Sequence, residues 1–293
     1  MPTDSAAEPI ISADQVLLLK PAIRKAISSM YARYAEPVTL SRLASEVFVS
    51  PFHFSRVFAK ATGVTPGRYL TAIRLFEAKQ LLLGTDLTVS DVVCSVGYSS
   101  VGTFTSRFTR AVGMTPTQYR DPEVRQLMVA ISPHYQRLPT PSALRAAGIG
   151  CASRASGVGA GLATIAGRIE LPHRAGPANV LIGVFGELVP QSSPMAWVAK
   201  TNVTTAGEFE IRGVPVGART LIAIAEHASG AEGLPFSIGT TPCSVGPGPA
   251  RHGARIRLRE SRPTDPPIAI TLATPTGPIG RSEPRRRRLD SVA

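Results

Sequence analysis

Hydrophobic residues recur at helical spacing in two similar stretches of the first part of the chain. In residues 38–50, and again in residues 87–100, apolar side chains follow the i, i+3, i+4, i+7 order of one face of an α-helix. These positions are Leu40, Leu43, Ala44 and Val47 in the first stretch and Val89, Val92, Val93 and Val96 in the second. Thr39 and Thr88 precede them as N-cap residues. Each stretch is therefore predicted to be a short amphipathic helix.

A second element follows each of these helices and is also repeated. Residues 50–69 read SPFHFSRVFAKATGVTPGRY and residues 100–119 read SVGTFTSRFTRAVGMTPTQY. They are identical at Ser50/Ser100, Phe54/Phe104, Phe58/Phe108, Ala61/Ala111, Gly63/Gly113, Thr65/Thr115, Pro66/Pro116 and Tyr69/Tyr119. The second copy has one extra residue in its turn, where Gly97 can adopt a left-handed conformation. Helix, short turn and helix make a helix-turn-helix, and the pattern predicts two of them.

Each repeat is predicted to have two faces of different chemistry. Phenylalanines four residues apart, such as Phe54 and Phe58, lie on one face and pack inward. The opposite face carries Phe52, Ser55, Arg56 and Ala59 in the first copy and Gly102, Thr105, Ser106 and Thr109 in the second. Short polar and guanidinium groups above bulky anchors can reach base edges in the major groove of DNA. A helix over residues 65–84 is placed to join two such helices in successive grooves, about 34 Å apart.

The repetition and the charge of the chain favour DNA over an ordinary core. A single amphipathic helix with two phenylalanines is more often part of a core than a reader of DNA. Here the unit occurs twice, with its preceding helix and its turn, and the chain carries 32 Lys and Arg against 20 Asp and Glu, a net charge of +12. Such a balance favours a polyanionic partner, and the repeat makes double-stranded DNA the best candidate.

From about residue 161 the pattern changes to short β-branched runs separated by Gly and Pro. These runs are ATIAGRIEL, NVLIGVFGEL, MAWVAKTNVT, GEFEIRG, ARTLIAIAEH, PFSIGT, ARIRLRE and PIAITLA. In GEFEIRG, Phe209 and Ile211 are predicted to point inward, and the charged residues between them outward. About seven or eight strands at this spacing predict an antiparallel β-sandwich.

The predicted fold is therefore multidomain, α then β. An all-α double helix-turn-helix domain covers residues 13–125, and a passage rich in Pro, Ala, Gly and Ser, residues 126–160, is expected to be a flexible linker. The β-sandwich covers residues 161–273. Residues 274–293 are expected to be a disordered basic tail.

Other features argue against a membrane protein, a metal site and an enzyme. No apolar run of about eighteen residues is present, so no membrane span is expected. The start, MPTDSAAEPIISADQ, lacks the basic region of a secretory signal, so we expect a cytoplasmic protein. The cysteines and the histidines of the second half are widely spaced, so we predict no disulfide framework, metal or cofactor. Nor is any catalytic set of nucleophile and base visible in the second half.

The repeats resemble the DNA-binding domain of the AraC/XylS family of bacterial transcription regulators. The resemblance covers roughly residues 17–121. It rests on the Ser-Pro start of the first reading helix, on R-x-x-x-A-x-x-L-L in the joining helix (Arg74, Ala78, Leu81 and Leu82), on the turn at Gly97–Tyr98, and on G-x-T-P-x-x-Y-R closing at Arg120. It implies seven helices that bind promoter DNA to alter transcription, with RNA polymerase as an expected partner.

Carried over by position, the family's base-reading places fall on Phe52, Ser55 and Arg56 in the first unit and on Gly102, Thr103, Thr105 and Ser106 in the second. Arg56 is the strongest candidate for direct readout, because a guanidinium pairs bidentately with guanine. Family members often have a long polar side chain where this chain has Val101 and Gly102. The second unit is therefore expected to read sequence weakly and to hold DNA through phosphate contacts from Arg107 and Arg110.

The second half resembles a known sandwich over a short stretch. Residues 201–225, TNVTTAGEFEIRGVPVGARTLIAIA, resemble the strand-turn-strand signature of carboxypeptidase-regulatory-like (transthyretin-like) domains. Such sandwiches usually bind or brace rather than catalyse. The resemblance leaves open a sensor for a small-molecule effector, a dimerisation surface and a contact for the transcription machinery.

Two alternatives differ in class from a sequence-specific regulator. Some regulators with this DNA-binding fold are joined to a DNA-repair alkyl acceptor, and Cys243 follows a proline as such a cysteine does, but no His-Arg comes after it. The other alternative is a non-specific basic protein that grips phosphate through Arg285–Arg288.

Overall fold

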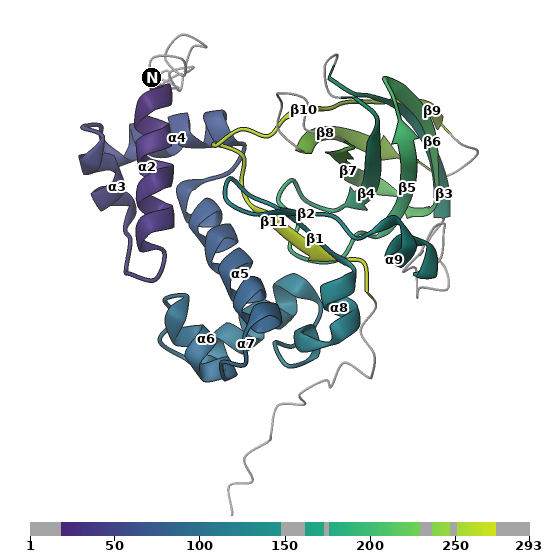
Figure 1. Cartoon of the computed structure of the whole chain (residues 1–293). Helices are drawn as coiled ribbons and strands as arrows, with labels where there is room; N and C mark the ends of the chain where they lie inside the picture. Colours follow the sequence, from purple (N-terminus) through teal and green to yellow (C-terminus); the bar gives the residue numbers. More distant parts are fainter. Residues whose placement is uncertain (1–18, 148–161, 173–175, 229–235, 247–250, 274–293) are drawn as a thin grey trace, which may run out of the picture.

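The computed structural model describes residues 19–147, 162–172, 176–228, 236–246 and 251–273 (Figure 1). The helices of residues 20–126, here called the helical domain, lie beside a β domain of residues 162–260, and a small sheet lies between them (Figure 1). The predicted order of α then β is confirmed at this level. The expected basic tail lies outside the described residues.

In the first helix-turn-helix unit, helices begin after Thr39 and Ser50 and the joining helix covers almost all of its predicted range, as the sequence predicts. Its helices are α2 (Lys20–Arg33), α3 (Leu40–Glu46) and α4 (Pro51–Thr62), and α5 (Pro66–Gly84) follows as the joining helix. The Thr39 hydroxyl accepts a hydrogen bond from the Arg42 amide at 3.2 Å, and the Ser50 hydroxyl accepts one from the His53 amide at 3.3 Å. Gly63 ends α4 in the left-handed conformation, with φ +81°.

The second unit repeats this arrangement. Its elements are α6 (Val89–Ser95), α7 (Val101–Val112), a 3₁₀ turn (Gln118–Arg120) and α8 (Pro122–Gln126). Thr88 and Asp91 form a capping box at the start of α6. The Ser100 hydroxyl accepts a hydrogen bond from the Thr103 amide at 3.3 Å, and Gly113 ends α7 with φ +81°. Equivalent residues therefore start and stop α4 and α7, the two helices that the sequence predicts to read DNA and that are called the reading helices below.

Each unit is built around the same ladder of three aromatic rings. In the first unit the centroids of Phe54 and Phe58 are 5.5 Å apart, and Phe58 meets Tyr69 edge-on at 5.4 Å. In the second unit the corresponding distances are 5.4 Å between Phe104 and Phe108 and 5.5 Å between Phe108 and Tyr119. All six rings are almost completely buried. The repeated aromatic pairs of the sequence are thus the cores of the two units.

Two sheets make up the β domain (Figure 1). The five-stranded sheet has the order β10-β8-β7-β4-β5, with β4 at Ala178–Phe185, β5 at Ala196–Val203, β7 at Gly217–His227, β8 at Phe236–Val245 and β10 at Arg259–Glu260. The three-stranded sheet has the order β6-β3-β9, with β3 at Leu162–Glu170, β6 at Ala206–Pro215 and β9 at Arg251–Arg257. Strands β3 and β9 are parallel and the other pairs antiparallel, which corrects the prediction of a purely antiparallel domain.

Alternation along the strands gives the two sheets a common core. Phe209 and Ile211 of β6 are buried, while Glu208, Glu210 and Arg212 between and beside them are exposed, as predicted. One buried cluster joins residues from both sheets, among them Ile165, Ile169, Val180, Ile182, Leu221 and Ile256. The sheets therefore pack against each other through their apolar faces.

The prediction of a flexible linker over residues 126–160 is wrong for residues 126–147, the part that the structure describes. Residues 126–147 contain strand β1 (Met128–Ile131), strand β2 (Gln136–Arg137) and helix α9 (Pro141–Ala146). Strand β1 pairs with β11 (Ile268–Thr271), which comes from the run PIAITLA that was predicted to belong to the sandwich. All four residues of each of these two strands are buried. The burial of two short apolar runs outweighs the Pro- and Ala-rich composition around them.

The two domains share a buried core across this small sheet. One apolar cluster contains Phe104, Phe108 and Tyr119 of the second unit, Val129 and Ile270 of the small sheet, and Phe185, Trp197 and Ile222 of the β domain. Phe76 of the joining helix packs with Met128, Ala130 and Ala269 in another. The helical domain is therefore covered on one side by the β domain, rather than tethered to it.

Candidate nucleic-acid interface

The anchors of α4 are buried, as the sequence predicts, and the opposite face is exposed at Phe52. Phe54 and Phe58 are at most 1% exposed, whereas Phe52 on the opposite face is 67% exposed. The guanidinium carbon of Arg56 lies 5.5 Å from the centre of the Phe52 ring, a cation–π distance. Ser55 and Arg56 are both half-buried. The helix thus presents a flat aromatic ring with a guanidinium over it.

The reading face of α7 is also exposed, but its side chains are short. Gly102, Thr103 and Ser106 are exposed and Thr105 is half-buried. Arg107 and Arg110 extend from the same helix and are exposed. A Cβ at Gly102 would meet only the Ser100 hydroxyl, at 4.0 Å, so the start of this helix is open. The two reading faces therefore differ, aromatic and basic in α4 and small and polar in α7.

Sequence reasoning missed Phe48, which lies in the turn before α4. Phe48 is 92% exposed and has φ +57°, a left-handed conformation that is uncommon for a bulky residue. The Lys25 ammonium lies 6.0 Å from the centre of its ring. In the second unit the equivalent position is Gly97, with φ +77°, packed against the backbone of Ala35. The sequence contained a signal for this conformation. The helices that precede the two turns are offset by 49 residues, so Phe48 aligns with Gly97, a glycine expected to be left-handed.

Arg74 of the joining helix links the two units. Its Nε donates to the Tyr34 carbonyl at 2.7 Å, and a terminal nitrogen donates to the Glu36 carbonyl at 2.8 Å. Both carbonyls belong to the segment between α2 and α3. The same guanidinium lies 5.7 Å from the centre of the Tyr98 ring, in the turn of the second unit. Arg74 thus bonds to the first unit and stacks on the second.

Lys79 of the same helix is completely buried. Its Nζ donates to the Gln191 carbonyl at 2.8 Å, to the Gln191 side-chain oxygen at 3.2 Å, and to the Ala269 carbonyl. It also lies 5.9 Å from the centre of the Tyr119 ring. Burial lowers the pKa of Lys79 to about 7, an effect that the Glu187 carboxylate partly opposes. Sequence reasoning had assigned no role to this lysine.

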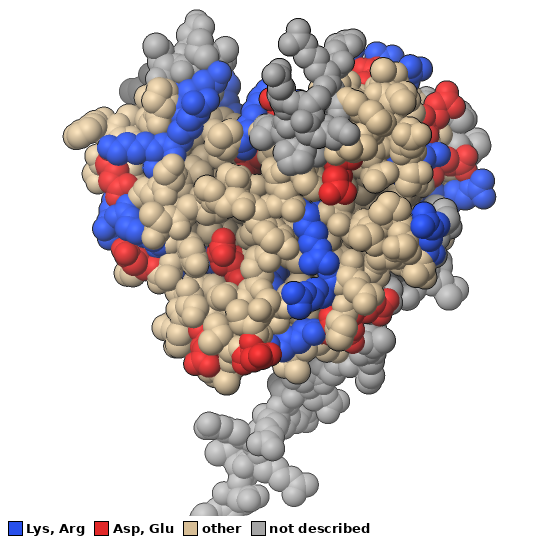
Figure 2. All heavy atoms as spheres, viewed as in Figure 1, with Lys and Arg blue, Asp and Glu red and all other residues tan. Residues whose placement is uncertain are grey.

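Charge is not concentrated on the face of the molecule seen in Figure 2. Blue and red side chains are interspersed there, and uncharged surface covers most of the view (Figure 2). Among the described residues, no helix is long and apolar enough to span a membrane. No cluster of three or more potential metal ligands occurs in that part of the chain either.

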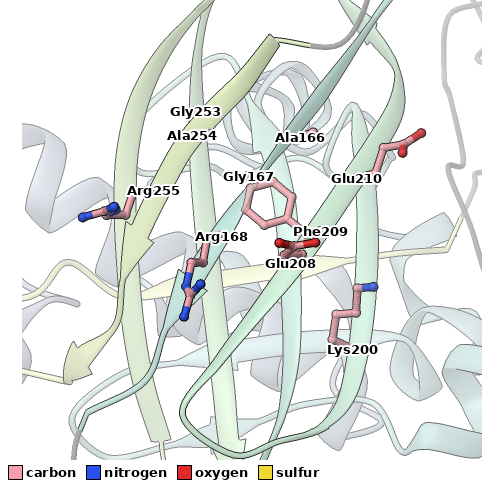
Figure 3. Close-up of a pocket in the computed structure, with 10 residues that line it drawn as sticks. All are labelled: Ala166, Gly167, Arg168, Lys200, Glu208, Phe209, Glu210, Gly253, Ala254 and Arg255. Atoms are coloured by element: carbon pink, nitrogen blue, oxygen red, sulfur yellow. The ribbon is translucent and has the colours of Figure 1, made fainter.

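The β domain has a hollow of about 430 Å³ on its three-stranded sheet (Figure 3). Arg168, Lys200 and Arg255 project around it together with Glu208 and Glu210. Gly167 lines the hollow and leaves no room for a side chain, because a Cβ there would collide with the Ala254 carbonyl oxygen and the Phe209 ring. The hollow is lined by side chains of both signs of charge.

Cys243 is half-buried on β8, and burial raises the pKa of its thiol. Arg219 lies opposite it in the strand register and lowers that pKa by less. The sequence alone does not predict this neighbour, because Arg219 lies beside Cys243 across the strands and not along the chain. The thiol is therefore held in its protonated form.

Comparison with known proteins matches the region that forms the two units. A family of helix-turn-helix domains matches residues 43–122. Residues 43–122 form an AraC-type helix-turn-helix domain. The chain is 31% identical over 112 residues to the lactose operon transcription activator of Staphylococcus xylosus, covering 38% of this chain and 40% of that protein. It is 37% identical over 111 residues to the RCS-specific transcriptional activator RclR of Escherichia coli, covering 38% and 39%.

Among solved structures, the chain is similar to the C-terminal domain of AraT, a response regulator from Geobacillus stearothermophilus. The identity is 33% and the TM-score 0.34, with 35% of this chain and 85% of that one covered. The chain spans about two fifths of the length of the two curated relatives. The chain therefore shares with these two relatives a stretch of 112 and 111 residues.

Proposed function

We propose that this protein is a sequence-specific regulator of transcription that places α4 and α7 in successive major grooves of promoter DNA. The observation that carries the proposal is the repeated geometry: two helices with equivalent caps, identical aromatic ladders and opposite faces that are at least partly exposed, joined by one continuous helix. A double reader needs two such helices on one body. The names of the relatives, a transcription activator in each case, agree with this function.

In this proposal α4 makes the main contacts with base edges, and α7 contacts mainly the DNA backbone. Arg56 pairs with a guanine edge in the major groove, with Ser55 beside it, and Phe52 makes apolar contacts with the neighbouring bases. The short side chains of α7 (Gly102, Thr103, Thr105 and Ser106) allow its backbone to approach the DNA closely, and the hydroxyl groups of the threonines and the serine read a second, weaker half-site. Arg107 and Arg110 then neutralise phosphates on either side.

Further partners belong to the same proposal. Activation or repression of a promoter requires contact with RNA polymerase, directly or through occupancy of its site. For a small-molecule effector or a protein partner we propose the β domain, with the mixed-charge hollow around Arg168 as the candidate binding place. A regulator of this kind acts in the cytoplasm, where the chromosome is.

We infer no enzymatic role, and in particular no alkyl-acceptor role for Cys243. An acceptor thiol must form a thiolate, and the raised pKa of Cys243 opposes this. Incubation with methylated DNA followed by mass spectrometry tests the inference. The expected mass of the peptide that contains Cys243 is unchanged, and a gain of one methyl group would overturn it.

Selection from a random-sequence duplex library tests the proposed function. The selected duplex and a scrambled version of it are then titrated with the protein at physiological salt. A sequence reader binds the selected duplex at least about a thousandfold more tightly. A purely electrostatic binder, the alternative class, would show equal affinities that fall together as salt is raised.

A further inference from the structure

Both aromatic ladders run from a reading helix to the β side of the molecule. In the first unit the ladder ends at Tyr69, whose hydroxyl donates to the Asp265 carbonyl at 2.9 Å. The Asp265 carboxylate accepts two hydrogen bonds from Arg259, at 2.8 and 2.7 Å, and one from the Arg262 amide at 2.8 Å. The segment between β10 and β11 is thereby fixed in place.

The second ladder reaches the same side through Lys79. It ends at Tyr119, whose ring lies under the Lys79 ammonium. That ammonium is bonded to Gln191, in the loop between β4 and β5, and to Ala269 of β11. Because Lys79 is fully buried, loss of any of these bonds would leave a buried polar group without a partner.

The loop between β4 and β5 touches both units. Glu187 pairs with Arg68 of the joining helix at 3.2 Å, and Val189 packs on the core of the first unit. The Leu188 side chain covers the end of α4, since a Cβ at Gly63 would lie 2.7 Å from its Cδ2 atom. Together with Ala111 near the end of α7, these residues line a cavity of about 270 Å³. The loop therefore lies between the C-terminal ends of the two reading helices.

We propose that the loop from Glu187 to Gln191, with Lys79 and Tyr69, positions the two reading helices relative to each other and so sets the half-site spacing that the protein accepts. Helices entering successive grooves must match the helical repeat of DNA, and an error of one base pair shifts and rotates one helix against its groove. The joining helix alone would allow α4 and α7 to adapt by bending. The β domain, held by a separate contact to each unit, opposes that motion. This inference rests on the proposed function.

A purely structural role for the same residues makes a different prediction. If the β domain only stabilises the helical domain, weakening its contacts lowers stability and affinity equally for every spacing. If it positions the helices, weakening the contacts changes the ratio of affinities between spacings. Spacing discrimination therefore separates positioning from stabilisation.

Three full-length variants probe the contacts separately. Lys79→Met removes the ammonium but keeps a buried chain of similar length. Tyr69→Phe removes only the hydroxyl that bonds to Asp265. The double variant Glu187→Gln, Leu188→Ser alters side chains that are 46% and 41% exposed, so it retains the fold even if Lys79→Met does not. The control matched to Tyr69→Phe is Tyr135→Phe, which removes the hydroxyl of an exposed ring that meets Phe76 edge-on.

The probe is a set of duplexes built from the site that the wild-type protein selects, with one base pair added or removed between the half-sites. For the wild type and Tyr135→Phe we expect the selected spacing to bind at least about tenfold more tightly than either neighbour. For the three variants we expect that ratio to fall to within roughly threefold. Folded variants that keep the full ratio would overturn the inference. A wild type that selects no sequence would instead contradict the proposed function.

Discussion

Phe48 and Gly97 occupy equivalent positions in the turns of the two helix-turn-helix units, and both have a left-handed backbone, with φ +57° and +77°. A glycine adopts this conformation at no steric cost, while a phenylalanine is strained. Phe48 is also 92% exposed, so packing does not compensate for the strain. The exposed phenylalanine in the turn before α4 is therefore maintained at some expense of stability.

Replacing Phe48 by glycine is expected to stabilise the protein. Relief of the left-handed strain contributes about 1 kcal/mol, reduced by the greater freedom of glycine in the unfolded chain. Thermal and urea unfolding measure the change. The control is Gly97→Ala, which must destabilise, because its Cβ would also collide with the backbone of Ala35. A Phe48→Gly variant that unfolds as readily as Gly97→Ala would refute this explanation.

Lys79 makes the stability of the protein depend on pH. Its pKa is lowered from the ordinary value of 10.5 to about 7 in the fold, because burial disfavours the ammonium. Between these values the unfolded chain binds more protons, so the fold gains stability as pH rises, by at most about 1.4 kcal/mol per pH unit. Below about pH 7 both states are protonated and this contribution is constant.

The test compares the wild type with Lys79→Met, which lacks the group. The difference in free energy of unfolding, wild type minus variant, should grow from about pH 7 to about pH 9, and the effects of all other titrating groups cancel in it. Parallel pH profiles of the two proteins would show that Lys79 keeps its ordinary pKa in the fold.

Removing residues 126–293 is expected to destabilise the helical domain. The cut exposes side chains that the rest of the chain buries, such as Phe76, which is 2% exposed and packs with Met128, Ala130 and Ala269. Newly exposed apolar surface costs about 25 cal/mol per Å². Melting temperature and solubility of residues 1–125 measure the loss, and substitution of Phe76 by Gln in the truncated chain should restore part of the solubility. A truncated domain as stable as the full chain would mean that the shared core contributes nothing.

The sequence predicted the helical domain in detail because its signals are local and occur twice. Capping residues such as Thr39 and Ser50 are satisfied within three residues, and the spacing of Phe54 and Phe58 defines the buried face without reference to distant contacts. The same spacing predicted that Phe52 and Arg56 lie on the opposite face, where Phe52 is exposed and Arg56 is half-buried. Whether they contact DNA bases is a prediction that these local signals cannot test.

What the sequence did not predict depends on contacts between distant residues. Met128 and Thr271 are strand partners 143 positions apart, and nothing local distinguishes their runs from linker and sandwich strands. Lys79 appears in the sequence as one more charged residue of a long helix, and only the β domain packed against it makes it buried. The positioning role proposed for the loop at Glu187 could not have been inferred without these contacts.

The central claim is that Arg56 on α4 reads DNA sequence. The most direct measurement is the affinity of Arg56→Ala for the selected duplex and for the scrambled duplex, at physiological salt. An Arg145→Ala control removes an exposed arginine of α9. The account predicts a loss of about 1–3 kcal/mol on the selected duplex for Arg56→Ala and a much smaller loss on the scrambled one, with little change for the control. An equal loss on both duplexes would contradict it.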